Sequence, residues 1–166
     1  MNPYIFREYD IRGIVEKDFT SDVVKNLGRA FGTYVIRSGG QKISISGDIR
    51  LTTPKLVKKF TEGLIDAGIH VLDMGILPTP ANYFSMYHLD VDGAVQITGS
   101  HNPAEFNGFK ISYNKGAFYG KQILELKHLI KSKNFERGIG KVENIDIMNS
   151  YLNMLKSKIQ LKKYKN

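Results

Sequence analysis

The sequence predicts an α/β fold in which a layered, mixed and largely parallel sheet carries helices on both faces. Two observations predict this class. Short apolar runs typical of strands alternate along the chain with longer segments whose apolar residues recur every three or four positions. A Thr-Pro pair, typical of a helix start, follows two of the strand-like runs. Strands that alternate with helices favour parallel pairing, because crossovers must connect them.

Four helices are predicted from the three-four spacing. The first ends at Gly39 and Gly40. In the second, Thr53 is expected to cap the helix, with Pro54 in the first turn, where its missing N–H costs nothing, and Gly68 ends it. The predicted helices lie at 21–36, 53–67, 79–87 and 122–131.

Four strands are predicted between and after these helices. KISIS alternates as a half-buried strand does, and the others are apolar runs bounded by turn residues. The predicted strands lie at 42–46, 69–74, 93–98 and 109–113. In such sheets, ligands bind beyond the carboxyl ends of the strands. The loop between the last two strands therefore lies where a functional site is expected.

The pattern weakens after Asn134. Residues 147–159 have a moderate helical signal, and the last eleven residues, KSKIQLKKYKN, contain five lysines and no acidic residue. We therefore predict a domain core over residues 1–134. Residues 135–166 are predicted to form a C-terminal helix and a basic linker leading toward a second domain.

Composition narrows the class of protein. The five terminal lysines account for most of the net charge of +8 and leave +3 for the rest, so the charge does not favour a nucleic-acid partner. The chain has no cysteine, which excludes a disulfide framework and a thiolate metal site and suits the cytoplasm. No apolar run approaches the length of a membrane span or a signal peptide, so no membrane partner is expected.

The stretch TGSHNPAEFNGFK at 98–110 concentrates polar chemistry in one loop. Gly99 allows a tight turn and the close approach of an anion. Ser100 offers a hydroxyl, with His101, Asn102 and Lys110 nearby in the chain. These groups suit phosphoryl transfer, in which positioning and charge neutralisation supply most of the catalysis. The alternative is a surface connection rich in turn-forming residues.

Competing motifs do not fit. Position 98 is threonine, so the loop lacks the first glycine of a G-x-S-x-G hydrolase elbow. GAFYGKQ at 116–122 is one residue short of a phosphate-binding P-loop and has Gln122 where serine or threonine is needed. The four histidines are scattered, without metal-ligand spacing.

TGSHNPAEFNGFK resembles the phosphoserine loop of the α-D-phosphohexomutases. FREYDIRG at 6–13 resembles their N-terminal signature, and LPTPANY at 77–83 lies between the two as in the bacterial phosphomannomutase/phosphoglucomutase branch. The similarity runs over essentially the whole chain. The resemblance implies domain I of an enzyme that interconverts 1-phospho and 6-phospho hexoses, with mannose and glucose as the expected sugars.

The resemblance also assigns residues. Ser100 matches the serine that carries the phosphoryl group and whose phosphate is a magnesium ligand. Lys110 matches a proposed general acid/base, and His101 is expected to assist catalysis beside it. The residues expected to contact substrate or phosphate are Tyr9, Arg12 and Asn102. Asp48 and Arg50 resemble a Gly-x-Asp-x-Arg element with Ser46 in the glycine slot, so they are expected to form a salt-bridged brace that supports the loop with Gly99.

The family has four domains around one cleft, and the motifs of the other three domains do not occur in this sequence. We therefore expect an isolated first domain that is inactive alone. The resemblance implies Mg²⁺ held mostly by the second domain, a sugar bisphosphate activator, and a phosphosugar and the remaining domains as partners. The alternatives are a phosphoglucosamine mutase, a non-catalytic module that binds an anion or a partner, and a nucleic-acid binder using the lysine-rich end.

Overall fold

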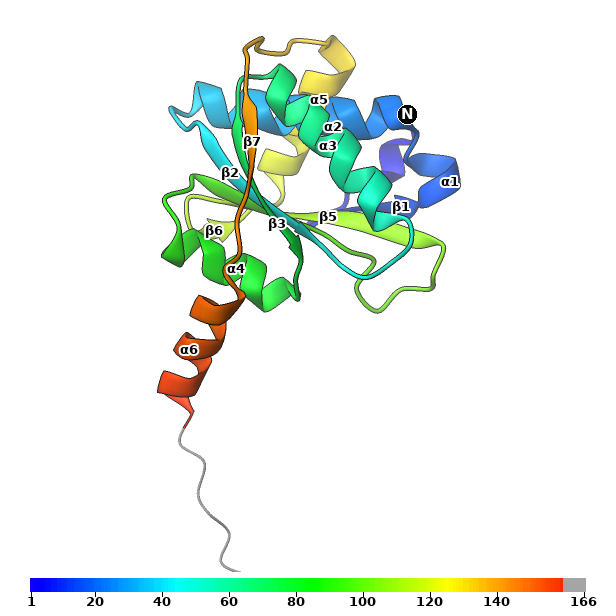
Figure 1. The fold of residues 1–166 in the computed structure, drawn as a ribbon. Coiled ribbons are helices and arrows are strands. Elements are labelled where there is room, and N and C mark those ends of the chain that lie inside the picture. Colours follow the sequence, from blue (N-terminus) through cyan, green and yellow to red (C-terminus); the bar gives the residue numbers. More distant parts are fainter. Residues whose placement is uncertain (160–166) are drawn as a thin grey trace, which may run out of the picture.

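The computed structural model describes residues 1–159, and most of the predicted basic linker lies outside this range (Figure 1). One mixed sheet of seven strands forms the centre of the described part. Its order is β1-β5-β4-β2-β3-β7, and the short strand β6 pairs with β5. The strands are β1 (Ile11–Ile14), β2 (Lys42–Gly47), β3 (His70–Ile76), β4 (Gly93–Ile97), β5 (Phe106–Tyr113), β6 (Gly116–Ala117) and β7 (Lys141–Asn144).

The predicted sheet, mixed and largely parallel, is confirmed. β2 pairs in parallel with β3 and β4, and β3 pairs in parallel with β7. β5 is antiparallel to each of its neighbours, which are β1, β4 and β6. It follows that, within the described sheet, β5 alone runs against the common strand direction.

Helices cover both faces of the sheet, as predicted (Figure 1). One face carries α2 (Ser21–Arg37), α3 (Thr53–Asp66) and α5 (Lys121–Ser132), and the other carries α4 (Thr79–His88). The short elements η1 (Pro3–Ile5) and α1 (Val15–Asp18) flank β1, and α6 (Met148–Lys158) extends away from the body of the fold. None of these helices combines the length and apolar character that a membrane crossing requires.

The larger hydrophobic core lies between the sheet and the three-helix face. Phe31 of α2, Phe60 of α3 and Phe109 of β5 are fully buried there, and the rings of Phe60 and Phe109 stack with centroids 5.1 Å apart. A smaller cluster under α4 includes Met74, Leu77, Ala81 and Ile147. α4 lies mainly against β4 and β2, and the same sheet face continues over β5 and β1, where it carries Arg12 and Lys110.

Strand β7 was not predicted. Its four residues are all exposed and lack an apolar alternation, so periodicity could not reveal them. Pairing with β3 creates this edge strand, and the Ile145 N–H donates to the Asp73 carbonyl at 2.9 Å just beyond it. The sheet therefore takes a strand from the segment that was assigned to the linker, whereas the helix expected at 147–159 is present as α6.

The expected cap of α3 was wrong. Thr52 occupies the N-cap position, and no side chain caps this helix end. Thr53 is buried, and its hydroxyl donates to the Asp48 carboxylate at 2.6 Å. The Thr53 hydroxyl thus binds the Asp48 carboxylate and does not cap the helix in the way that the local sequence preference had suggested.

Candidate functional site

The loop from Thr98 to Glu105 leaves the end of β4 and returns as β5. Ser100 lies at its apex, is exposed, and has a left-handed backbone with φ of +53°, which is uncommon for a residue with a side chain. The Ser100 N–H donates to the Thr98 hydroxyl at 2.9 Å, and the Asn102 N–H donates to the Gly99 carbonyl at 3.0 Å. Local hydrogen bonds therefore hold the loop in a tight turn that presents the Ser100 hydroxyl to solvent.

Asp48, at the end of β2, anchors the start of this loop. One carboxylate oxygen accepts the Thr98 hydroxyl at 2.8 Å and the Gly99 N–H at 3.0 Å. The other accepts the Thr53 hydroxyl at 2.6 Å and the Arg50 N–H at 3.0 Å. Burial by itself raises the pKa of Asp48, but these hydrogen bonds outweigh it and hold the pKa below its usual value.

Arg50 collects the carbonyl groups of the loop. Its guanidinium donates to four backbone oxygens, those of Ser100 at 3.2 Å, Asn102 at 2.6 Å, Pro103 at 2.7 Å and Phe106 at 3.0 Å. The same guanidinium pairs with Asp48, with Nε and the carboxylate oxygen 3.4 Å apart. The expected ion pair between Asp48 and Arg50 is therefore present, and it joins the two ends of the loop.

Gly99 is required by this packing. A Cβ at this position would clash with the guanidinium carbon and Nε of Arg50, which leave no room for a side chain. The sequence motif thus has a steric reason for its glycine. Arg50 can reach the carbonyls beyond the turn because residue 99 has no side chain in the space that the guanidinium occupies.

Two loop side chains lie next to the Ser100 hydroxyl or its turn. His101 places Nδ1 3.4 Å from the Ser100 Oγ, and both groups are exposed. The Asn102 amide donates to the Gly99 carbonyl at 2.9 Å, so its observed contact holds the turn. His101 thus brings a group that can carry a proton next to the hydroxyl.

Arg12 and Lys110 lie on the sheet face that also carries α4. Their neighbours in β1 and β5, Ile11 and Phe109, are buried on the opposite face, and side chains alternate along a strand. Arg12 forms an ion pair with Asp10, two residues earlier in the chain. Both basic groups therefore project from the same side of the sheet.

Backbone pairing relates these two residues to the loop. Gly108 of β5 is opposite Arg12, and its carbonyl accepts the Thr98 N–H at 3.0 Å. The backbones of Arg12 and Thr98 are therefore two strand spacings apart, a distance of about 10 Å. Lys110 is opposite Gln96, two residues before the loop begins.

The predicted site residues do not all share one hollow. Ser100 lines a hollow of about 740 Å³ with Asp48 and Arg50, whose rim carries the exposed side chains of Ile49 and Leu51. A second hollow of about 380 Å³ is lined by Tyr9, Lys110 and residues of α4. Tyr9 is exposed, and its ring lies 6.1 Å from that of Tyr119. The structure thus groups the loop with its brace and, separately, Tyr9 with Lys110.

Sequence reasoning missed three partners of these residues. Thr98 and Thr53 both donate to Asp48 from distant segments, and no local pattern marks them. Asp10 could have been found, because it stands two residues before Arg12 and carries the opposite charge. Within residues 1–159, no group of three or more acidic, histidine or cysteine side chains could hold a metal ion.

The chain matches known proteins along most of its length. The family model described as phosphoglucomutase/phosphomannomutase, alpha/beta/alpha domain I, matches residues 3–137. The chain is 37% identical to a phosphomannomutase/phosphoglucomutase of Pseudomonas aeruginosa over 159 residues, which is 96% of this chain and 34% of the relative. It is 36% identical to a phosphoglucomutase of Neisseria meningitidis over 161 residues, 96% of this chain and 35% of the relative.

Solved structures of the same family are similar to this chain in fold. A phosphoglucomutase/phosphomannomutase family protein of Burkholderia thailandensis matches with a TM-score of 0.94 and 38% identity, covering 98% of this chain and 37% of that protein. A phosphomannomutase structure from Thermus thermophilus matches with a TM-score of 0.83 and 25% identity, covering 93% of this chain and 36% of that one. The chain spans about a third of the length of the relatives it matches.

Proposed function

Because this chain belongs to the phosphoglucomutase/phosphomannomutase family, of which it carries the α/β/α domain I, we propose that it supplies the phosphoserine loop of a phosphohexomutase. Ser100 is the residue that carries the phosphoryl group. The observation that supports this role best is the brace: Asp48 and Arg50 fix the loop from both ends while the Ser100 hydroxyl stays exposed. A fixed and accessible acceptor is what transfer to a bound sugar requires.

The proposed reaction moves phosphate between O1 and O6 of a hexose in two transfers. In the first, a hydroxyl of the hexose monophosphate attacks the phosphorus on Ser100. The bond to the serine oxygen breaks as the bond to the sugar oxygen forms, and the products are a hexose bisphosphate and free Ser100. In the second, the bisphosphate is bound in the reverse orientation and returns its other phosphoryl group to Ser100. The loop is thereby regenerated, and the sugar leaves as the isomeric monophosphate.

The nearby side chains have distinct proposed roles. Lys110 acts as the general acid/base toward the sugar hydroxyl, and His101, 3.4 Å from the Ser100 Oγ, assists proton movement there. Arg12 and Tyr9 contact the substrate and its phosphate from the side of the sheet that carries α4. Asn102 contacts the phosphate on Ser100, and its side-chain amide also holds the turn by donating to the Gly99 carbonyl. An arginine fork suits phosphate oxygens because it presents several donors in one plane.

We propose Mg²⁺ as the metal of this reaction, where it neutralises phosphate charge. This chain offers the phosphate oxygen of Ser100 as a ligand, since both oxygens of nearby Asp48 already accept hydrogen bonds. In residues 1–159 no cluster completes the coordination, so the remaining ligands are assigned to another part of the enzyme. The reaction is proposed to occur in the cytoplasm, with the other family domains as partners and a sugar bisphosphate as activator.

A labelled-phosphate experiment tests the proposal. The protein as the organism produces it is incubated with hexose 1,6-bisphosphate carrying labelled phosphate, and the labelled residue is identified by peptide mass spectrometry. We expect label on Ser100, no label and no mutase turnover in Ser100→Ala, and normal labelling in the control Ser157→Ala, which changes an exposed serine of α6. Turnover by Ser100→Ala would refute the proposal.

The substrate is tested in the same assay. Glucose and mannose phosphates are the proposed substrates, because the similar proteins are named phosphomannomutase/phosphoglucomutase and phosphoglucomutase. Glucosamine phosphate is the alternative, and a preference for it would replace the proposed sugar class. Binding of the bisphosphate with neither labelling of Ser100 nor turnover of any of these sugars would favour the non-catalytic anion-binding module.

A further inference from the structure

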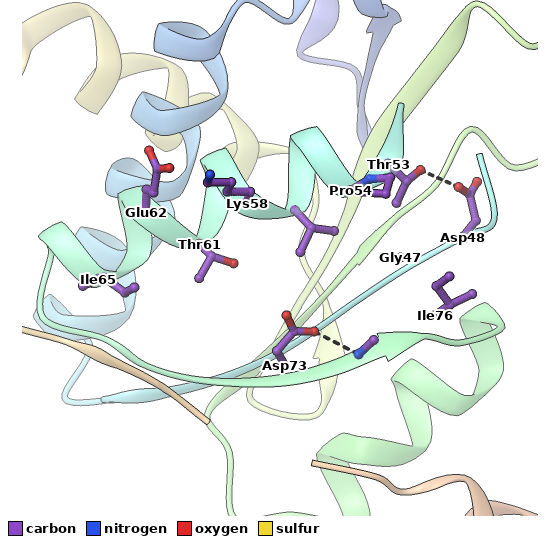
Figure 2. A pocket seen from close by; sticks show the side chains of 12 residues that line it. Gly47, Asp48, Thr53, Pro54, Lys58, Thr61, Glu62, Ile65, Asp73 and Ile76 are labelled. Carbon is purple, nitrogen blue, oxygen red and sulfur yellow. Dashed lines mark hydrogen bonds between the residues drawn. The ribbon is translucent and has the colours of Figure 1, made fainter. Parts of the chain in front are cut away.

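Another cavity, which shares only Asp48 with the hollow that Ser100 lines, lies between α3 and the end of β3 (Figure 2). Its volume is about 460 Å³, which is within the range typical of small-molecule sites. β7 pairs with β3 only as far as Asp73, so the last residues of β3 leave this side of the cavity open. Its walls are largely apolar and include Pro54, Val57, Ile65 and Ile76.

Thr61 of α3 places an unused hydroxyl at the wall of this cavity. The side chain is 92% buried, with 8% of its surface exposed, and its Oγ1 has no hydrogen-bond partner in the part of the chain that the structure describes. Burial of an unpaired hydroxyl is unfavourable, and valine would fill the same space without that cost. The hydroxyl therefore lies unsatisfied at the cavity wall, and an occupant that reaches it would supply the missing partner.

Asp73 of β3 faces Thr61 across the cavity. Figure 2 shows the two side chains projecting into the space between α3 and β3 from opposite sides. One oxygen of Asp73 accepts the Gly75 N–H at 2.9 Å, and Asp73 takes part in none of the ion pairs found in residues 1–159. A carboxylate without a cation thus stands beside an apolar wall and an unpaired hydroxyl.

The other carboxylates at this cavity are already engaged. Glu62 pairs with Lys59 at 2.7 Å and points away from the space in Figure 2. Both oxygens of Asp48 accept hydrogen bonds from Thr53 and the loop segments. The hydrogen bond from Lys59 lowers the pKa of Glu62, and the positive charge of Lys58, which also lines the cavity, helps to lower it. Asp73 is consequently the lining carboxylate without an ion pair or a full set of hydrogen bonds in residues 1–159, and the charge that complements it is positive.

We propose that this cavity binds a small primary amine with an apolar body. The ammonium group donates to the Asp73 carboxylate and to the Thr61 hydroxyl, and the apolar body packs against Val57, Ile65 and Ile76. This site is separate from the proposed phosphoryl transfer and does not depend on it. Amines of this class are bound because the cavity combines an unneutralised carboxylate with apolar surface that gains from being covered.

Benzylamine is the probe for this proposal. The whole chain, labelled with ¹⁵N, is titrated and followed by the backbone amide signals, and we expect saturable shifts at Thr61 and Gly75 with a dissociation constant of about 1 mM or tighter. Asp73→Asn keeps an acceptor for the Gly75 N–H but removes the charge, so it should weaken binding about tenfold. Thr61→Val should weaken it about threefold. Asp22→Asn, an exposed change at the start of α2, should bind as the parent chain does.

Benzoate has a similar size and shape but the opposite charge, and it should cause no saturable shift in the same signals. Absence of saturable shifts with benzylamine would overturn the proposal. Equal binding of benzoate, or unchanged benzylamine affinity in both Asp73→Asn and Thr61→Val, would overturn it as well. Thr61→Val preserves side-chain shape, so it gives the answer if Asp73→Asn does not fold. None of these outcomes bears on labelling of Ser100.

Discussion

Asp48→Asn should loosen the Ser100 loop and lower the stability of the domain. The two oxygens of Asp48 each accept one backbone N–H at 3.0 Å, one from Arg50 and one from Gly99. An asparagine has one amide oxygen, so whichever way it is oriented, its NH₂ group faces one of these two N–H donors. The threonine hydroxyls can turn and accept instead, but a backbone N–H cannot.

The expected loss follows from these contacts. One buried N–H left without an acceptor costs about 1–3 kcal/mol, and the remaining hydrogen bonds lose about 1 kcal/mol because their acceptor is no longer charged. We expect the free energy of unfolding to fall by about 3 kcal/mol, which for a chain of this size lowers the melting temperature by about 9 °C. Asp90→Asn, which changes the exposed partner of Lys42, should leave the free energy of unfolding nearly unchanged.

Urea unfolding and amide hydrogen exchange measure this effect. Exchange of the Gly99 N–H should accelerate in Asp48→Asn and stay unchanged in Asp90→Asn. Because the pKa of folded Asp48 lies below the ordinary value of 3.8, its stabilising contribution is present above that value and is lost as the pH falls through the folded pKa. The difference between parent and variant should therefore shrink in acid. Equal stability of the two proteins at pH 7, with unchanged Gly99 exchange, would refute the bracing role.

Three further changes test single features of the fold. Gly99→Ala should destabilise the domain by about 2 kcal/mol in urea unfolding, because the new Cβ clashes with Arg50; a neutral result would mean that Arg50 has another path to the loop. Thr61→Val should raise the melting temperature by about 3 °C, since it removes an unpaired buried hydroxyl, and a lower value would show that the hydroxyl has a partner. Ser100→Gly should stabilise the domain by about 0.5–1 kcal/mol by relieving the left-handed backbone, whereas Ser100→Ala should not stabilise it.

Much of the fold could be predicted from local patterns. Helices α2, α3 and α5 each pack one apolar face, so the three-four spacing identified them. Strands β2 and β4 are buried apolar runs between turn residues. β7 could not be found this way, because its residues are exposed and its strand conformation comes from pairing with β3.

The Ser100 loop also combines features that the local sequence predicts with contacts that only the tertiary structure forms. The order of Gly99, Ser100 and His101 is a local feature of the sequence, and it is enough to indicate both the turn and a hydroxyl at its apex. The resemblance also pointed to Asp48 and Arg50 as a salt-bridged brace, but not to the loop hydrogen bonds that each of them makes. Thr98 and Thr53 had no sequence signal, because each acts through a partner that is far away in the chain.

The sequence by itself determined the fold class, the main helices and strands, and the short loop on which the proposed chemistry depends, because each rests on residues that are neighbours along the chain. Only the tertiary structure decided that Asp48 would hold Gly99 from a position 51 residues away, that Arg50 would bind four loop carbonyls, and that Thr61 and Asp73 would face one cavity. Hydrogen bonds and cavities of this kind depend on which strands and helices become neighbours, and sheet pairing sets that arrangement.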